Sequence, residues 1–439
     1  MTRGEMTPQW LNWPGQRVPE ILATVGERTV EPVGVTGGSA ARLYSNSAIM
    51  TVTNLAGRGI GYAYIILMAK RLGVHTIGAY AILVSASMLL ELVSNLGLDK
   101  ILIREIASTG VGAGQGYFQA ALQIRIAVAA VSATAAWALL MAFFKDLPAS
   151  PVSVALYLSS IFFIVAARNC EAFLTAHERL LPVAASQIVE RVVIFGAVVA
   201  LAFGGLSFNE LLCIVPLASL ARLLVVTRST FRLWTPKVIS ARPQRKKLLG
   251  QALELFSVEI LSLVYGRSDM FLVAKMNGLG AAGVYQICYK VFDLCVSLFS
   301  GFLQAVFPRM VRDRSRKSLS RVLGGGTALI IIPAGIIIVA RHQLLGALKP
   351  EYLSGSNALI WLMLTIPLMY ITSTIANVAI VAGRTRLLIG AAALLIGTNV
   401  ALNLVLIPRY AINGAAFSTF ACELMSAVVL VPIVLRVTA

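Results

Sequence analysis

Runs of about twenty apolar residues follow one another along most of the chain, separated by short polar stretches. A helix of that length crosses the roughly 30 Å of hydrocarbon in a bilayer. We therefore expect an all-α polytopic membrane protein. The pattern predicts about twelve transmembrane spans, at residues 47–68, 76–98, 117–144, 151–174, 182–204, 208–228, 250–275, 281–308, 320–341, 354–382, 386–407 and 412–436.

The composition indicates that lipid is the solvent for most of the chain. Its 439 residues are 58% hydrophobic and 13% charged, whereas soluble domains are about 25% charged. A formal net charge of +18 would suit a nucleic-acid binder, but most basic residues fall in loops between apolar runs. Cytoplasmic loops are enriched in Lys and Arg. We therefore expect no nucleic-acid partner, and a protein of the cytoplasmic (inner) membrane with both termini in the cytoplasm.

Residues 1–45 differ from the rest of the sequence because they are polar and rich in Gly, Pro, Thr and Glu. They lack the apolar core and cleavage site of a signal peptide. We expect a disordered cytoplasmic tail here.

An internal repeat divides the remainder. The segment Ala69-Lys70-x-x-Gly73-x-x-x-x-Gly78-x-Tyr80 recurs as Ala274-Lys275-x-x-Gly278-x-x-x-x-Gly283-x-Tyr285, with every identity at the same offset of 205 residues. An even number of spans separates the copies, so the repeats share their orientation and are related by a pseudo-two-fold axis along the membrane normal, as in many transporters. We expect two six-helix lobes, at residues 46–228 and 250–439, joined by a basic cytoplasmic linker at residues 229–249. Such lobes can rock around a central cavity.

Charged residues inside the predicted spans mark the candidate site. A charge at mid-bilayer costs at least about 2.5–3.5 kcal/mol, so it persists where it faces water, a partner or a ligand. The deepest cations are Arg58, Arg267 and Lys290. Cations around a water-filled cavity suit an anionic substrate, because Arg binds phosphate oxygens in pairs and Lys adds a point charge. We assign to substrate binding Arg58, Arg267, Lys290, Asn54, Gln286 and Arg125. We assign to ion coupling or charge balance Asp269, Asp293, Glu259 and Glu91.

A plainer interpretation stays open for these charges. Lys290 can pair with Asp293, and Arg267 with Asp269 or Glu259, as contacts between helices without a ligand. Two further arginines, Arg168 and Arg222, lie near the expected cytoplasmic ends of spans, where their side chains can reach the lipid headgroups.

Neither a metal site nor a cofactor is expected. The five cysteines show no paired spacing and no neighbouring histidines, so small apolar core residues are their expected role. No Gly-rich nucleotide loop is present, so transport would run downhill or on an ion gradient.

Several motifs follow one another along nearly all the chain beyond the tail. They are Arg71-Leu72-Gly73-x-x-x-x-Gly78-x-Tyr80, Asn95-Leu96-Gly97-Leu98, Ile103-Arg104-Glu105, Arg267-x-Asp269, Gly283-x-Tyr285, Phe307-Pro308 and Asn399-x-x-x-Asn403-x-x-x-Ile407-Pro408-Arg409-Tyr410-x-x-x-Gly414-Ala415-Ala416. Together they resemble the Wzx-type polysaccharide flippases of the multidrug/oligosaccharidyl-lipid/polysaccharide exporter superfamily. Within this resemblance, Arg267 and Asp269 match the family's charged pair, whereas Arg58 and Lys290 match no family motif.

The resemblance implies that the chain moves a polyprenyl-pyrophosphate-linked oligosaccharide to the outer leaflet for exopolysaccharide, capsule or O-antigen assembly. A polysaccharide polymerase and glycosyltransferases would then be possible partners. The alternatives are an ion-coupled multidrug or cation antiporter, which the deep cations disfavour, and a lipid II flippase, which usually has fourteen spans. A membrane glycosyltransferase or polymerase is disfavoured because no outside loop is long enough for a catalytic domain.

Overall fold

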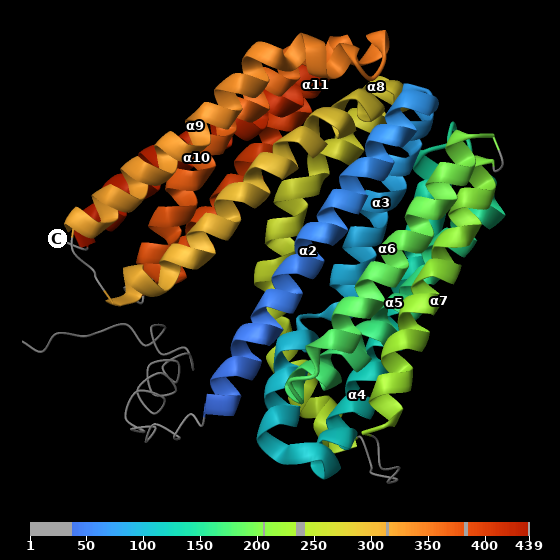
Figure 1. Cartoon of the computed structure of the whole chain (residues 1–439). Coiled ribbons are helices and arrows are strands. Elements are labelled where there is room, and N and C mark those ends of the chain that lie inside the picture. The colour runs from blue at the N-terminus through green and yellow to red at the C-terminus, as the bar shows by residue number, and fades with distance from the viewer. Residues whose placement is uncertain (1–36, 205–206, 234–241, 313–315, 382–384, 438–439) are drawn as a thin grey trace, which may run out of the picture. The chain divides into compact units, whose positions relative to one another are not determined.

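The computed structural model describes residues 37–204, 207–233, 242–312, 316–381 and 385–437 (Figure 1). The chain divides into residues 1–49 and a compact unit of residues 50–439, which contains all the contacts below. The described residues form helices and no strand. The helices are α2 (Gly37–Arg71), α3 (Val74–Asn95), α4 (Leu98–Phe143), α5 (Pro151–Ala176), α6 (Leu180–Ala202), α7 (Phe208–Phe231), α8 (Arg242–Arg312), α9 (Arg316–Gly346), the 3-10 helix η2 (Pro350–Gly355), α10 (Ser356–Val381) and α11 (Thr385–Val437).

The described residues contain nine helical stretches long and apolar enough to cross a membrane. Val264–Leu303 contains Gly278 of α8, and Gly390–Leu430 contains Ala411 of α11, each a residue with non-helical backbone angles. Each of these residues falls between two predicted spans, so one stretch covers both. The nine are Val74–Ser108, Gly114–Phe143, Pro151–Ala176, Leu180–Ala202, Phe208–Phe231, Val264–Leu303, Arg321–Gly346, Pro350–Ala379 and Gly390–Leu430. The all-helical membrane fold is confirmed, and the number twelve stays a prediction.

The first predicted span, residues 47–68, lies within α2 and is not one of the nine stretches. Its polar residues Asn54, Arg58 and Tyr62 lower the mean hydropathy of the segment. Helix α2 also begins at Gly37. The end of the predicted tail, residues 37–45, is therefore helical, and residues 1–36 lie outside the described residues.

Local sequence signals explain where two helices begin. Ser150 precedes α5 and accepts a hydrogen bond from the Ser153 backbone N–H. Pro151 follows at the first helical position, where its missing N–H costs nothing. Helix α7 begins with a capping box, in which Ser207 and Glu210 each accept a hydrogen bond from the other's backbone N–H.

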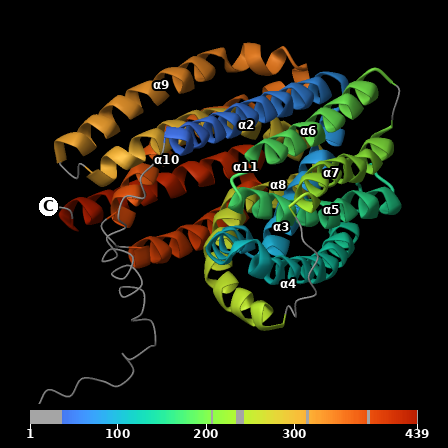
Figure 2. The same ribbon diagram turned by 60° about the horizontal axis from the view of Figure 1, so that its bottom comes forward.

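The helices pack in two groups within the compact unit. We call α3–α7 the N-half: α5 packs on both α4 and α7, and α6 packs on α7 (Figure 2). We call α8–α11 the C-half, in which α10 packs on α11, α9 and α8. The two halves meet where α3 and α4 pack against α8. The predicted linker, residues 229–249, overlaps the end of α7 at Phe231 and the start of α8 at Arg242, and residues 234–241 lie outside the described part.

The two copies of the repeat pack directly against each other where α3 meets α8. A Cβ at Gly78 would lie 1.8 Å from the Leu279 carbonyl oxygen, and a Cβ at Gly283 would lie 1.9 Å from the Val74 carbonyl oxygen. Gly283 and Leu279 are the repeat equivalents of Gly78 and Val74, so the contact is reciprocal. A reciprocal contact of this kind is what a two-fold axis between the copies produces. We call it the glycine crossing.

A second contact joins the halves, between the start of α4 and the first part of α8. Lys100 Nζ lies 3.1 Å from Glu259 Oε1, and Lys247 Nζ donates to Glu105 Oε2 at 2.6 Å. Arg104 donates to Gln251 at 2.8 Å. The hydrogen bonds to Glu105 and to the Tyr117 hydroxyl raise the pKa of Lys247, so this ammonium stays charged at neutral pH. We call these contacts the polar clasp.

Candidate functional site

Three adjoining cavities lie inside the compact unit. The cationic chamber has a volume of about 340 Å³ and the N-half chamber of about 430 Å³. Both are lined by Gly57, Arg58, Met88 and Arg191. A third chamber, of about 410 Å³, shares Met88 with them and reaches Glu259 of the polar clasp. All three volumes fall in the range of small-molecule sites.

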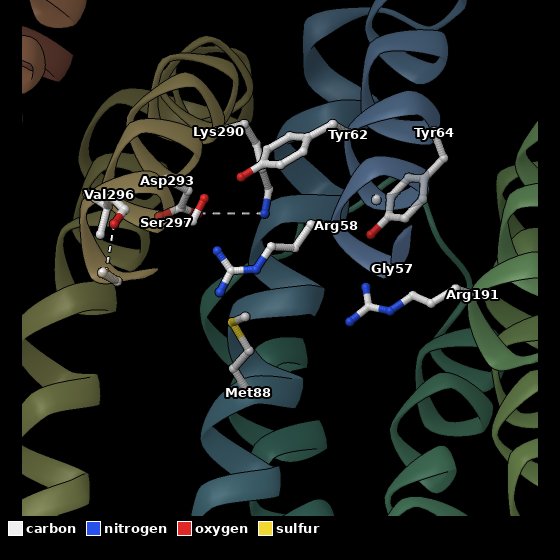
Figure 3. A pocket seen from close by; sticks show the side chains of 12 residues that line it. Gly57, Arg58, Tyr62, Tyr64, Met88, Arg191, Lys290, Asp293, Val296 and Ser297 are labelled. Atoms are coloured by element: carbon white, nitrogen blue, oxygen red, sulfur yellow. Dashed lines mark hydrogen bonds and ion pairs between the residues drawn. The ribbon is translucent and has the colours of Figure 1, made fainter. Parts of the chain in front are cut away.

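The cationic chamber collects charged side chains from three helices (Figure 3). Arg58 comes from α2, Arg191 from α6, and Lys290 and Asp293 from α8. Asp293 Oδ2 lies 3.7 Å from Lys290 Nζ and 3.7 Å from a guanidinium nitrogen of Arg267. The guanidinium of Arg267 also stacks 5.2 Å from the ring centre of Tyr289. One carboxylate therefore serves two cations.

The other two cations of the chamber have no such partner. Among the residues that the structure describes, neither Arg58 nor Arg191 has a carboxylate within 4.0 Å. Both guanidinium groups are exposed to the cavity space that the two chambers share. The lining therefore carries an excess of positive charge, which a bound anion would neutralise.

The remaining predicted site residues lie in several places. Asn54 and Glu91 line the N-half chamber, and Glu259 lines the third chamber while pairing with Lys100. Gln286 is 1% exposed and lies outside the three linings. Asp269 is also buried, and accepts hydrogen bonds from the Tyr285 hydroxyl at 2.5 Å and the Met270 backbone N–H at 2.8 Å.

Arg125 is not part of the lining of any of the three cavities. It is 0% exposed and donates to Asn95 at 2.9 Å and to Asp99 at 2.6 Å. The interpretation as helix-to-helix pairing therefore describes Arg125 well. Lys290 does lie near Asp293, but both are on α8, three residues apart, so this contact lies within one helix. Arg267 lies closest to Asp293, rather than pairing with Asp269 or Glu259 as considered from the sequence.

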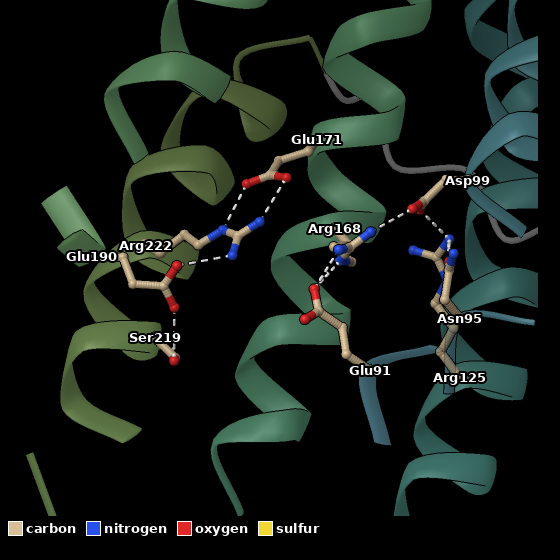
Figure 4. Close-up of polar contacts among 9 residues, drawn as sticks. All are labelled: Glu91, Asn95, Asp99, Arg125, Arg168, Glu171, Glu190, Ser219 and Arg222. Atoms are coloured by element: carbon tan, nitrogen blue, oxygen red, sulfur yellow. Dashed lines mark hydrogen bonds and ion pairs between the residues drawn. The ribbon is translucent and has the colours of Figure 1, made fainter. Parts of the chain in front are cut away.

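Ion pairs also join the helices of the N-half (Figure 4). Arg168 of α5 contacts Glu91 of α3 and lies 2.8 Å from Asp99 of α4, which in turn holds Arg125. Arg222 of α7 donates twice to Glu171 of α5, at 2.8 and 2.9 Å, and once to Glu190 of α6, at 2.9 Å. We call this set the N-half ion-pair network. It comprises Glu91, Asn95, Asp99, Arg125, Arg168, Glu171, Glu190, Ser219 and Arg222.

This network corrects the expectation that Arg168 and Arg222 reach the lipid headgroups. The Arg222 side chain is 10% exposed, and the Arg168 side chain, 33% exposed, is held by two carboxylates. The sequence places both residues near span ends, but it does not show which carboxylates other helices bring to the same depth. Arg191 was not assigned to the site for the same reason: it directly follows Glu190, and only the fold shows that Glu190 pairs with Arg222 while Arg191 lines the cavities.

The chain is similar to known proteins in sequence and in fold. A family model described as "Polysaccharide biosynthesis protein" matches residues 43–313. No curated protein matches the chain. Among solved structures, the lipid II flippase MurJ in an inward-closed conformation is 17% identical, with a TM-score of 0.73 over 88% of this chain and 89% of that chain.

Two transporters of the MOP superfamily are also similar. An inward-facing multidrug resistance MATE family transporter is 11% identical, with a TM-score of 0.68 over 87% of this chain and 94% of that chain. A MOP superfamily transporter from Pyrococcus furiosus is 12% identical, with a TM-score of 0.57 over 90% and 93%. At such low identity these likenesses establish the fold, and the substrate has to be argued from the site.

Proposed function

This chain belongs to the family of polysaccharide biosynthesis proteins, and from that premise we propose that it is a flippase for a polyprenyl-pyrophosphate-linked oligosaccharide. It moves this lipid across the cytoplasmic membrane by alternating access, for surface polysaccharide assembly. Both termini lie in the cytoplasm. Glycosyltransferases supply the substrate on that side, and a polysaccharide polymerase consumes it on the other.

The excess positive charge of the cationic chamber is the observation that carries the proposal. Arg58, Arg191 and Lys290 come from three helices, and the carboxylate of this lining, Asp293, is shared by Lys290 and Arg267. A pyrophosphate diester presents two negative charges and several acceptor oxygens. Guanidinium groups bind such oxygens in pairs, and a lysine adds a third centre of charge. An organic cation would be repelled by the same lining.

The contacts between the halves support alternating access. The glycine crossing joins helix ends that the predicted topology puts outside, and the polar clasp joins segments that it puts in the cytoplasm. The third chamber reaches Lys100 and Glu259 of the polar clasp, and the cationic chamber is lined by residues of α2, α3, α6 and α8. We propose that each contact opens in turn while the anion stays in the cationic chamber.

The proposal is tested by binding and transport with the reconstituted protein. Replacing Arg58 and Lys290 together by Ala should weaken binding of a short-chain polyprenyl-pyrophosphate saccharide by about a hundredfold or more, since a hydrogen bond to a charged group contributes about 1.5–3 kcal/mol. Transport of a fluorescent derivative into proteoliposomes should fall accordingly.

Lys70→Ala is the matched control, because Lys70 is an exposed cation on the same helix α2. It should bind and transport as the unaltered protein does. Unchanged transport in the double variant would remove these cations from the site and the proposal with them.

Lipid II transport is the second candidate, because a lipid II flippase shares this fold. Lipid II presents the same pyrophosphate, so the cationic chamber does not discriminate between the two substrates. A competition experiment discriminates between the two substrates. An excess of unlabelled lipid II should leave transport of the oligosaccharide lipid unchanged. Strong inhibition would favour the second candidate.

Asp293 should set how tightly the empty chamber attracts an anion. Asp293→Asn removes the carboxylate that Arg267 and Lys290 share, so both cations become available to the substrate. We expect the affinity for glycan-free polyprenyl pyrophosphate to rise about tenfold, or by about 1.4 kcal/mol, measured by titration in nanodiscs. Glu351→Gln, which removes an exposed carboxylate on η2, is the control. Unchanged or weaker binding in Asp293→Asn would contradict the role given to Asp293.

A further inference from the structure

The N-half chamber differs in chemistry from the cationic chamber that it adjoins. Its wall contains neutral hydrogen-bonding side chains from five helices, α2, α3, α5, α6 and α7. These are Thr53, Asn54, Ser87, Tyr157, Ser160, Gln187 and Ser219. Apolar side chains lie between them, among them Ile164, Ile188 and Val215. A wall that mixes neutral donors and acceptors with apolar patches suits an uncharged ligand with many hydroxyl groups.

Apart from Arg58 and Arg191, which it shares with the cationic chamber, the charged groups on this wall are already paired within the protein. Arg168 is held by Glu91 and Asp99, and Arg222 is held by Glu171 and Glu190 (Figure 4). Groups fixed in such pairs gain little from exchanging a protein partner for a ligand. The neutral side chains are therefore what the chamber offers to a ligand on this side.

Two of these neutral side chains lack a partner in the protein. Among the described residues, neither the Asn54 amide, which is exposed, nor the Gln187 amide, which is half-buried, makes a hydrogen bond within the chain. Each amide carries two donor hydrogens and an acceptor oxygen. Both face a cavity of about 430 Å³ that shares Arg58 and Arg191 with the cationic chamber. Such amides can donate hydrogen bonds to the hydroxyl groups of a sugar ring and accept hydrogen bonds from them.

We propose that the N-half chamber binds the saccharide residue attached directly to the pyrophosphate. This inference rests on the proposed function, because it places the pyrophosphate in the cationic chamber. Arg58 and Arg191 lie on the wall common to both chambers, where the bond between phosphate and sugar would pass. In this scheme Asn54 and Gln187 bind the sugar, and Arg58 and Lys290 bind the charged pyrophosphate.

Three lipids separate the two parts of this scheme. They are a short-chain polyprenyl pyrophosphate without sugar, the same lipid carrying one hexose, and the same lipid carrying one 2-acetamido-hexose. Affinities are measured by titration of the full chain in nanodiscs. We expect at least one sugar-bearing lipid to bind about tenfold tighter than the bare lipid. The Asn54→Ala/Gln187→Ala variant should bring that ratio close to one, since each lost hydrogen bond is worth about 0.5–1.5 kcal/mol.

Two controls accompany the measurement. Ser160→Ala should lower the ratio of affinities, whereas Ser159→Ala should leave it unchanged, because Ser159 lies outside the chamber lining and its hydroxyl donates to the Leu156 carbonyl. Arg58→Ala/Lys290→Ala should weaken the binding of all three lipids while keeping the ratio between them.

The outcomes distinguish the inference from the function on which it rests. Equal affinity of the unaltered protein for all three lipids overturns the sugar site and leaves the pyrophosphate site standing. An equal loss for bare and sugar-bearing lipids in Asn54→Ala/Gln187→Ala also overturns it, since these amides would then act on the pyrophosphate. Failure of all three lipids to bind, or their indifference to Arg58→Ala/Lys290→Ala, overturns the proposed function itself.

Discussion

Replacing Gly78 by Ala should reduce transport by about a hundredfold. The added Cβ would lie 1.8 Å from the carbonyl oxygen of Leu279, a backbone atom that cannot rotate away. The helices must then separate, and the halves no longer close at the glycine crossing. Overpacking of this kind costs up to about 3 kcal/mol, which corresponds to about a hundredfold loss of the closed state. Gly283→Ala should behave in the same way, because its Cβ would meet the Val74 carbonyl at 1.9 Å.

Transport into proteoliposomes measures this effect, and Gly280 provides the matched control. A Cβ at Gly280, three residues from Gly283 on the same helix, would lie 3.7 Å from the nearest atom, an ordinary contact with His75. Gly280→Ala should therefore transport normally. Normal rates in Gly78→Ala and Gly283→Ala would show that closure at this crossing is not part of the transport cycle.

Arg222→Ala should destabilise the protein more than any other single change in the N-half ion-pair network. Arg222 makes three hydrogen bonds to Glu171 and Glu190, and its removal leaves two buried carboxylates without their partner. Breaking a buried ion pair from one side costs about 3–5 kcal/mol. We expect a large fall in the midpoint of thermal unfolding in detergent, together with poor yield.

Two comparisons isolate the cause. The triple variant Arg222→Met/Glu171→Gln/Glu190→Gln removes all three charges and should recover most of the lost stability, because neutral groups of similar shape leave no buried charge. Arg228→Ala, at an exposed position of the same helix α7, should change stability little. A small effect of Arg222→Ala alone would mean that water reaches Glu171 and Glu190.

The membrane fold could be predicted because its main signal is one-dimensional. Apolar runs mark the helices, and the single offset of 205 residues between the repeat copies predicted related halves before any contact was known. The glycine crossing shows those same repeat residues packed on each other. Helix ends were harder to predict. Helix α8, for example, runs past the predicted span limits and changes direction at Gly278 without a loop.

The site could be predicted only in part. A sequence shows how far along its span a residue lies, but it does not show which residues of other helices that residue faces. Lys290 and Asp293 share a face of α8 by their spacing, and Arg58 lies opposite them in the cationic chamber. Arg125 has a similar depth but meets Asp99, and is fully buried. Arg191 was not assigned to the site, because its contribution depends on where α6 lies, which no local pattern reveals.

The glycine crossing also constrains how the two copies of the repeat can change. Gly78 and Gly283 fill one narrow gap from opposite sides, each against the backbone of the other copy. A first side chain that forces the helices apart opens space for a second, so the double replacement should cost less than the sum of the single ones. Substitutions in the two duplicated segments are therefore coupled. A methyl group added in one copy changes which residues the other copy tolerates.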